Sequence, residues 1–145
     1  MLAIREATET DYPLIADSYW RTARSVPACY GAGRAFLVSM LDRVIADPSW
    51  NVVVLYETDV PDETIGWAAY RATDELFWLA IKPRFQRLGM ARELLRLIGS
   101  GRELYVPFAD PRLVSVARIR GYDLRLRPYM PLVKVIDVTC NGQTG

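Results

Sequence analysis

The sequence has no histidine and only two cysteines among its 145 residues. The absence of histidine excludes a Ser-His-Asp triad, a Cys-His catalytic pair and an imidazole metal ligand. The cysteines, Cys29 and Cys140, are too few and too far apart in the sequence to indicate a zinc site or a disulfide framework. We therefore expect free thiols in a reducing cytoplasm, no bound metal, and catalysis, if present, by other side chains.

Long hydrophobic runs are also absent. The longest, Val52 to Tyr56 and Phe77 to Ile81, are far shorter than the roughly 20 residues that span a bilayer. The first residues, Met1 to Glu6, contain no hydrophobic core of signal-peptide length. These two absences predict a cytoplasmic protein with no membrane partner.

Positively and negatively charged residues are nearly equal in number, and the formal net charge is +1. This balance argues against a protein dedicated to coating nucleic acid, although Arg118, Arg120, Arg125 and Arg127 form a local basic cluster. We interpret that cluster as a solvated surface, with nucleic acid as the less favoured partner. The length predicts one domain, residues 1–139, followed by a flexible tail, residues 140–145.

The hydrophobic pattern predicts an α/β protein with a central, mixed, mostly antiparallel sheet flanked by about four helices. Three hydrophobic runs in the middle of the chain, joined by turn residues at 59–63 and 72–74, indicate an antiparallel meander. The expected strands are residues 2–7, 51–57, 64–71, 75–82 and 103–108, with one or two more within 123–139. The expected helices follow the capping residues 8–11, run through 36–45, begin at Gly89, and lie between 110 and Gly121.

The segment from Leu79 to Arg92 carries the most chemical information, because it contains four cations and no anion. A strand that leads through a loop into a helix at Gly89 leaves backbone N–H groups at the positive end of the helix dipole. Such a helix start suits a phosphate, which Arg84, Arg87 or Arg92 could also contact. A glycine flanked by arginines on an ordinary solvated surface is the alternative interpretation.

The run Gln86-Arg87-Leu88-Gly89-Met90-Ala91 resembles the Gln/Arg-x-x-Gly-x-Gly/Ala signature of the GNAT family of N-acetyltransferases. The order of predicted elements is similar to that of the family from about Leu2 to about Val138, and Gly121-Tyr122 resembles the Gly-Phe that many members carry. The resemblance implies that acetyl-CoA, or another acyl-CoA, binds where the fourth and fifth strands diverge. An amine acceptor would attack the thioester directly, without metal.

The resemblance also assigns roles to residues. The backbone of Leu79, Ala80 and Ile81 would pair with the pantetheine arm, and the amides from Arg87 to Arg92 would receive the pyrophosphate. The resulting set of cofactor-binding candidates is Leu79, Ala80, Ile81, Arg84, Gln86, Arg87, Leu88, Gly89, Met90, Ala91 and Arg92.

Two carboxylates, Asp74 and Glu75, are the candidates for the base that removes a proton from the amine. Their alternative role is to polarise a hairpin turn. The family's general acid is a tyrosine four residues before the glycine of Gly-Phe, and this chain has Ala117 there. Ser115 is a substitute candidate; otherwise the thiolate leaves unaided, or the protein binds CoA with little catalysis.

Aromatic residues supply the candidates for contacts with the acceptor: Trp20, Tyr30 and Tyr70. Trp50, Trp67 and Trp78 are expected in the core instead. The function that these expectations support is acetyl transfer from acetyl-CoA to a small-molecule or protein amine, by a monomer or homodimer. The alternatives are a CoA-binding protein of the same fold with little catalysis, or a relative of phage proteins that modify nucleic acid.

Overall fold

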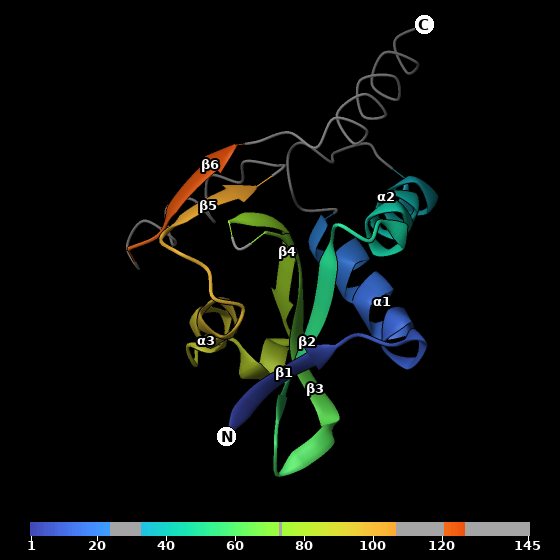
Figure 1. Ribbon diagram of the computed structural model, residues 1–145. Coiled ribbons are helices and arrows are strands. Elements are labelled where there is room, and N and C mark those ends of the chain that lie inside the picture. The colour runs from blue at the N-terminus through green and yellow to red at the C-terminus, as the bar shows by residue number, and fades with distance from the viewer. Residues whose placement is uncertain (24–32, 73, 107–120, 127–145) are drawn as a thin grey trace, which may run out of the picture.

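A computed structural model describes residues 1–23, 33–72, 74–106 and 121–126, and its centre is a six-stranded sheet (Figure 1). The strands follow chain order across the sheet: β1 (Leu2–Glu6), β2 (Asn51–Glu57), β3 (Val60–Arg71), β4 (Glu75–Ile81), β5 (Glu103–Val106) and β6 (Asp123–Leu126). β1 to β4 pair antiparallel, whereas β4, β5 and β6 pair parallel. The mixed, mostly antiparallel sheet expected from the sequence is therefore confirmed.

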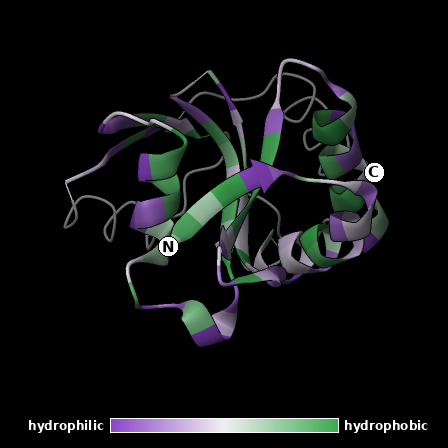
Figure 2. Ribbon diagram, turned by 60° about the horizontal axis from the view of Figure 1, so that its bottom comes forward, coloured by the Kyte–Doolittle hydropathy of each residue, from purple (hydrophilic) through white to green (hydrophobic). Residues whose placement is uncertain are grey.

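Helices cover both faces of this sheet (Figures 1 and 2). Helices α1 (Tyr12–Ala23) and α2 (Arg34–Ala46) lie on one face, and α3 (Met90–Leu97) lies on the other. Short 3-10 turns, η1 (Glu9–Asp11) and η3 (Pro83–Phe85), precede α1 and α3. The helix expected between 110 and Gly121, the end of the strand 103–108, and residues 127–145 lie outside the described residues.

The core between α1, α2 and the sheet follows the predicted helical spacing. Leu37, Met40, Leu41 and Val44 are buried on α2, but Ile45, expected on the same face, is 40% exposed. Ile45 lies about 100° from Val44 and about 40° beyond Leu41 around the helix axis, so it falls outside the border of the buried stripe, in the last turn of α2. Trp50 and Trp67 are buried and Trp78 packs against the same cluster, as expected.

A second core lies between α3 and the opposite face of the sheet. Leu94, Leu95 and Ile98 of the α3 segment are buried there with Leu76 and Leu104. The two cores pack against opposite faces of the sheet and thereby fix the position of β4. The backbone edge of β4 that faces β5 is not covered by either core. Across the described part of the chain, no helix has the length and hydrophobicity needed to cross a membrane.

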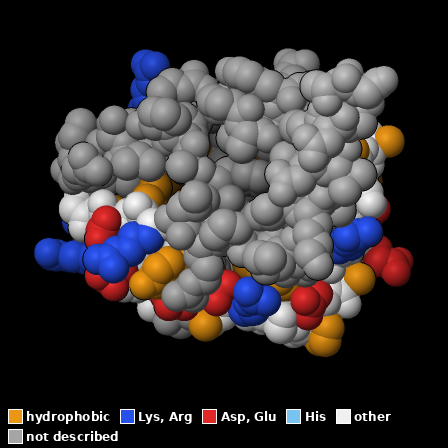
Figure 3. All heavy atoms as spheres, turned by 90° about the horizontal axis from the view of Figure 1, so that it is seen from above, with side chains coloured by type: hydrophobic (Ala, Val, Ile, Leu, Met, Phe, Trp, Pro, Cys, Tyr) orange, Lys and Arg blue, Asp and Glu red, His pale blue; other side chains and the backbone are white. Residues whose placement is uncertain are grey.

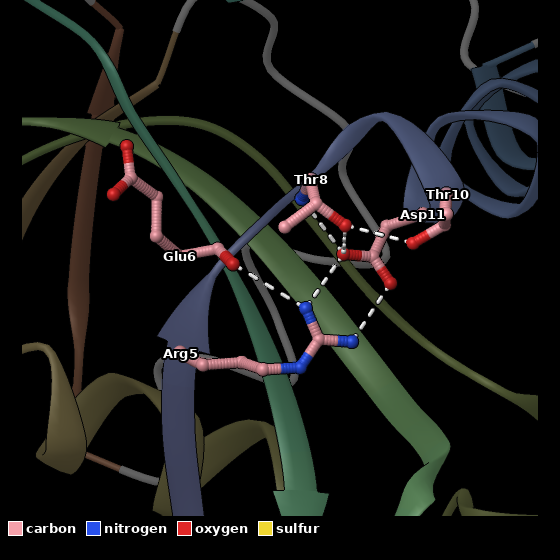
Figure 4. A network of polar contacts seen from close by, with 5 residues as sticks. All are labelled: Arg5, Glu6, Thr8, Thr10 and Asp11. Atoms are coloured by element: carbon pink, nitrogen blue, oxygen red, sulfur yellow. Dashed lines mark hydrogen bonds and ion pairs between the residues drawn. The ribbon is translucent and has the colours of Figure 1, made fainter.

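A polar network joins the end of β1 to the start of α1 (Figure 4). The Arg5 guanidinium donates to both carboxylate oxygens of Asp11, at 2.6 and 2.8 Å, and the Thr8 N–H donates to Asp11 at 2.8 Å. These contacts lower the pKa of Asp11 to about 2, the Arg5 hydrogen bonds contributing most. The predicted capping role of residues 8–11 is thus confirmed.

The hairpin between β2 and β3 differs from the prediction. Residues 60–63, expected in a connecting loop, extend β3, and Val60 pairs with Glu57. Irregular pairing around Tyr56 accommodates Pro61, which lacks the N–H that a regular ladder requires. The turn consequently shrinks to Thr58 and Asp59.

Candidate functional site

The strands β4 and β5 diverge from a single point of contact (Figure 1). Within the described residues their parallel pairing is limited to Glu75 opposite Tyr105, next to a 2.7 Å hydrogen bond from the Tyr105 N–H to the Asp74 carbonyl. Six further residues of β4, residues 76–81, continue without a described partner on this side. The sheet therefore opens toward the carboxyl end of β4, which leads into the signature segment.

Backbone groups of β4 point into this opening at alternate residues. The Lys82 N–H donates to the Ile65 carbonyl of β3 at 2.9 Å. Because backbone groups alternate sides along an antiparallel ladder, Ala80 also faces β3, while Leu79 and Ile81 face away from it. The Ile81 carbonyl accepts a 3.0 Å hydrogen bond from Gln86 Nε2, which agrees with that direction. Leu79 and Ile81 thus supply the backbone groups expected to meet a ligand, and Ala80 does not.

A bulge at Phe77 accompanies the divergence. Leu76 pairs with Tyr70 and Trp78 pairs with Ala69, so Phe77 is an extra residue in β4. The bulge breaks the alternation of side chains: Phe77 and Trp78 both pack on the α1–α2 side, whereas Leu76 and Leu79 pack on the α3 side. A bulge strengthens local twist and redirects a strand, which accounts for the separation of β4 from β5.

The loop before α3 presents a run of backbone N–H groups. Arg87 and Gly89 adopt left-handed conformations, with φ of 65° and 78°. The first backbone bond of the helix runs from the Glu93 N–H to the Gly89 carbonyl at 3.1 Å, so among the described residues the amides of 87–92 have no backbone acceptor. Left-handed residues in a turn gather N–H groups into an anion-binding concavity, and the helix dipole adds positive potential there.

Side chains around this loop differ in their availability. Arg84 forms an ion pair with Glu63 and lies over the Phe85 ring, 4.6 Å from the ring centroid to Cζ. Arg87 and Arg92 are exposed and form no ion pair with a described residue. Leu88 is 63% exposed, while Met90 and Ala91 are half-buried. Arg87 and Arg92 are therefore better placed than Arg84 to contact an added anion.

The two candidate carboxylates lie at the closed end of the opening. The Glu75 Oε2 atom accepts hydrogen bonds from Arg71 Nη2 at 2.7 Å and Nε at 3.1 Å. Asp74, half-buried, contributes its carbonyl to the contact with Tyr105. Sequence reasoning missed Arg71 and Glu63 as partners of site residues. The short hairpin at 72–74 could have revealed Arg71, because it places Arg71 opposite Glu75.

The acceptor candidates are not brought together. Trp20 is half-buried on α1, against the core on the α1–α2 face, whereas Tyr70 packs against the α3-side core. The sheet therefore separates these two side chains. Tyr30 and Ser115 lie outside the described residues, as do Ala117 and both cysteines.

Charges of both signs lie interspersed around the border of the face shown in Figure 3, among the residues described there. Arg125, the described member of the predicted basic cluster, contacts Glu103 at 2.8 Å and Asp123 at 3.0 Å. No group of three metal-ligating Asp, Glu or Cys side chains occurs in the described ranges.

Several solved structures that resemble this fold are acetyltransferases. A possible acetyltransferase from Clostridium difficile 630 superposes with a TM-score of 0.61 at 13% identity, covering 89% of this chain and 95% of the other. An acetyltransferase from Thermus thermophilus gives 0.58 at 22% identity, covering 83% and 86%. AAC(6')-Iy, in complex with the bisubstrate analogue CoA-S-monomethyl-acetylneamine, gives 0.52 at 15% identity, covering 85% and 91%.

Comparison with protein-family models and with curated protein sequences gives no match. The structural likeness thus shows the fold, and it confirms the GNAT fold that the signature segment and element order predicted. The acceptor and the roles of individual residues are not given by a likeness at these identities.

Proposed function

We propose that the protein is an N-acyltransferase that moves an acetyl group from acetyl-CoA to an amine. The observation that carries this proposal is the opening between β4 and β5. It places the backbone groups of Leu79 and Ile81, which face away from β3, beside the N–H groups at the start of α3. A thin, extended thioester with an anionic end fits such an arrangement. The GNAT fold supports the same chemistry, and AAC(6')-Iy was solved with a CoA-based analogue.

In the proposed complex, the pantetheine amides hydrogen-bond with the backbone of Leu79 and Ile81. The pyrophosphate lies against the N–H groups of residues 87–92, and Arg87 and Arg92 add charge-assisted hydrogen bonds. Gln86 keeps its contact with the Ile81 carbonyl and thereby fixes the path from strand to loop. Gly89 leaves the backbone accessible, since nothing lies within 4 Å of the position that its Cβ would occupy.

The proposed reaction is direct aminolysis of the thioester. The neutral amine nitrogen attacks the carbonyl carbon and forms a tetrahedral intermediate. The carbon–sulfur bond then breaks, and the nitrogen gives up a proton to solvent or to the departing thiolate, which leaves an amide and CoA. An alkylamine with a pKa near 10.4 is mostly protonated at neutral pH, so a base must first take a proton from nitrogen. Glu75 is the proposed base, because Arg71 fixes its carboxylate at the closed end of the opening. Asp74 is the alternative.

The leaving group needs little protein assistance. A thiol with a pKa near 8.5 is a tolerable leaving group as the thiolate, so Ala117 in place of the family's tyrosine slows the reaction without preventing it. Ser115 is the proposed proton donor if one acts. The same Ala117 favours the second candidate function, a protein that binds CoA and transfers little.

One paired experiment separates these functions. Calorimetric titration measures the binding of acetyl-CoA and CoA, and a thiol-release assay follows turnover over a panel of small amines, peptides and polyamines. Binding together with amine-dependent thiol release supports acyl transfer. Binding without turnover on any acceptor supports the second function, and the absence of CoA binding contradicts both.

A further inference from the structure

Three residues from neighbouring strands lie in one row across the sheet: Trp50, Arg71 and Glu75. Arg71 pairs with Glu75 across the β3–β4 hairpin. Trp50 immediately precedes β2, where Asn51 pairs with Tyr70, so the same register places Trp50 opposite Arg71. Side chains of residues that lie opposite one another share a face of the sheet. This face is the α1–α2 side, because Trp50 belongs to the core there.

Contacts join the three side chains in the same order. The Arg71 Cζ atom lies 4.7 Å from the centroid of the Trp50 ring, within the range of a cation–π interaction. The same guanidinium donates to Glu75 Oε2 from Nη2 and Nε, at 2.7 and 3.1 Å. The side chains of Arg71 and Glu75 are 34% and 19% exposed, so solvent screens this pair less than a fully exposed one. Arg71 thus lies between an aromatic ring and the carboxylate proposed as the base.

The Trp50 ring is the rigid end of this row. It is buried and packs edge-to-face on Phe77, with the two ring centroids 6.0 Å apart. The backbone N–H of Trp50 donates to the Asp47 carbonyl at 3.1 Å, in the turn between α2 and β2. A planar guanidinium that stacks on a fixed ring keeps its orientation, which the ammonium of a lysine does not. The position of Trp50 therefore limits the directions in which Arg71 can donate.

A second carboxylate lies within the influence of Arg71. Asp47 Oδ1 accepts hydrogen bonds from the Ser49 N–H and hydroxyl, at 2.9 and 2.8 Å. These two bonds lower the pKa of Asp47 most, and the charge of Arg71 lowers it further. Arg71 therefore interacts with two carboxylate charges, and stacking on Trp50 favours the orientation in which it donates to Glu75. Without the ring, the guanidinium would divide between the two.

We propose that Trp50 is a positioning residue for the acyl transfer and acts on Glu75 through Arg71. Its ring supports the guanidinium, and the guanidinium holds the Glu75 carboxylate where it takes a proton from the amine nitrogen. A displacement of about 1 Å in a reacting group can cost about 100-fold in rate, so a contact one side chain away from the base can control turnover. The inference rests on the proposed function, in which Glu75 is the base.

The test compares Trp50→Leu with the unsubstituted protein in the thiol-release assay and in titration with CoA. We expect kcat to fall about five- to thirtyfold, the effect of losing a partly desolvated cation–π contact, and the Kd of CoA to stay unchanged. Trp50→Phe, which keeps an aromatic ring, should recover most of the lost kcat.

The matched control is Trp67→Leu. Trp67 is also buried in the α1–α2 core, but its Nε1 atom donates to Ser18 Oγ at 3.1 Å. Trp67→Leu should therefore lower the thermal midpoint without the fall in kcat.

A double-mutant cycle separates positioning from a structural role. The Glu75→Gln protein has no carboxylate to position, so the addition of Trp50→Leu should leave its kcat unchanged. A structural role would lower kcat by the same factor in both backgrounds, and that result would overturn the proposal. Arg71→Lys keeps the charge but loses the stacking plane and the fork of donors, so it should lower kcat at least as much as Trp50→Leu.

Circular dichroism and the thermal midpoint show which variants are folded. If Trp50→Leu does not fold, full kcat in Arg71→Lys still overturns the proposal, because the effect of Trp50 passes through Arg71. If the unsubstituted protein releases no thiol with any amine, the proposed function fails and this role fails with it. Amine-dependent turnover with equal losses in the two backgrounds overturns the role of Trp50 alone.

Discussion

Arg71 donates two hydrogen bonds to one oxygen of Glu75, at 2.7 and 3.1 Å, across the hairpin that joins β3 to β4. This contact fixes the carboxylate of Glu75, which is the residue of β4 that pairs with β5 among the described residues. The arrangement places a candidate base at the closed end of the opening, while the loop proposed to bind the pyrophosphate lies at the open end. Binding and proton transfer are thus expected to respond to different substitutions.

The first prediction concerns Glu75. Replacement by Gln should lower kcat about 100- to 10,000-fold with an amine acceptor, the usual contribution of a general base, and should leave the Kd of CoA unchanged. Steady-state thiol release and calorimetry measure these two quantities. Glu103→Gln, an exposed carboxylate on β5, is the control. An unchanged kcat in Glu75→Gln, with a large loss in Asp74→Asn, would transfer the role to Asp74.

Gly66 tests the packing of β3 against β4. A Cβ at this position would lie 2.5 Å from the Ala80 carbonyl oxygen and 2.6 Å from Ile81 Cδ1, so the strands must move apart to accept Ala. Gly66→Ala should reduce the free energy of unfolding by about 1 to 3 kcal/mol, as overpacking does, and should weaken CoA binding by displacing Ile81. Gly101→Ala, which meets nothing within 4 Å, should do neither. Urea denaturation measures the expected reduction in the free energy of unfolding.

Asp11 makes stability depend on pH in the acid range. Its pKa is lowered to about 2 in the folded protein from 3.8, mainly by Arg5, so the stabilisation is complete above about pH 4 and is lost as the pH falls toward 2. Asp11→Asn should cost about 1 to 2 kcal/mol at pH 7, after allowance for the partial exposure of Arg5. The difference from the unsubstituted protein should shrink between pH 4 and 2 in thermal unfolding.

The control for this prediction is Asp17→Asn, which removes an exposed i, i+4 pair with Arg21 on α1. Its effect should stay below about 0.5 kcal/mol at every pH. If Asp11→Asn lowered the free energy of unfolding by the same amount at every pH, the Arg5 contact would not be the cause of the lowered pKa of Asp11.

Arg87 combines a left-handed backbone with an exposed charge. Arg87→Gly should retain or slightly raise stability, because glycine relieves a conformation that costs other residues about 1 to 2 kcal/mol. The same change should weaken CoA binding about three- to tenfold, by loss of one charge-assisted hydrogen bond. Ala72→Gly, at φ 48° in the β3–β4 turn, offers the same backbone relief without the charge. Equal CoA affinity in the two variants would contradict the role of Arg87.

The sequence predicted the elements that depend on local signals. Gly89 at the start of α3, the capping residues 8–11 and the hydrophobic spacing of α2 each act within a few residues, and the structure confirms them. The bulge at Phe77 could not be predicted, because residues 76–81 are hydrophobic at every position and no alternation was available to be broken. Side-chain partners from distant segments were also missed.

Two pairs illustrate that limit. Arg84 was expected at the ligand, but the extended β3 places Glu63 beside it, a consequence of the changed hairpin. Trp20 and Tyr70 were expected in one site, yet they pack on opposite faces of the sheet. Which face a strand residue takes depends on register, and register depends on bulges and on the helices that cover each face.

The central claim is that the turn before α3 binds the pyrophosphate of CoA, and a comparison of two glycines tests it most directly. Gly89 and Gly99 lie at opposite ends of α3, both with φ of 78° and both with nothing within 4 Å of an added Cβ. Substitution by Asp therefore imposes similar backbone strain at either end. Calorimetric titration with CoA should show no detectable binding for Gly89→Asp and near-normal affinity for Gly99→Asp. Equal affinity for CoA in the two variants would contradict the proposed site.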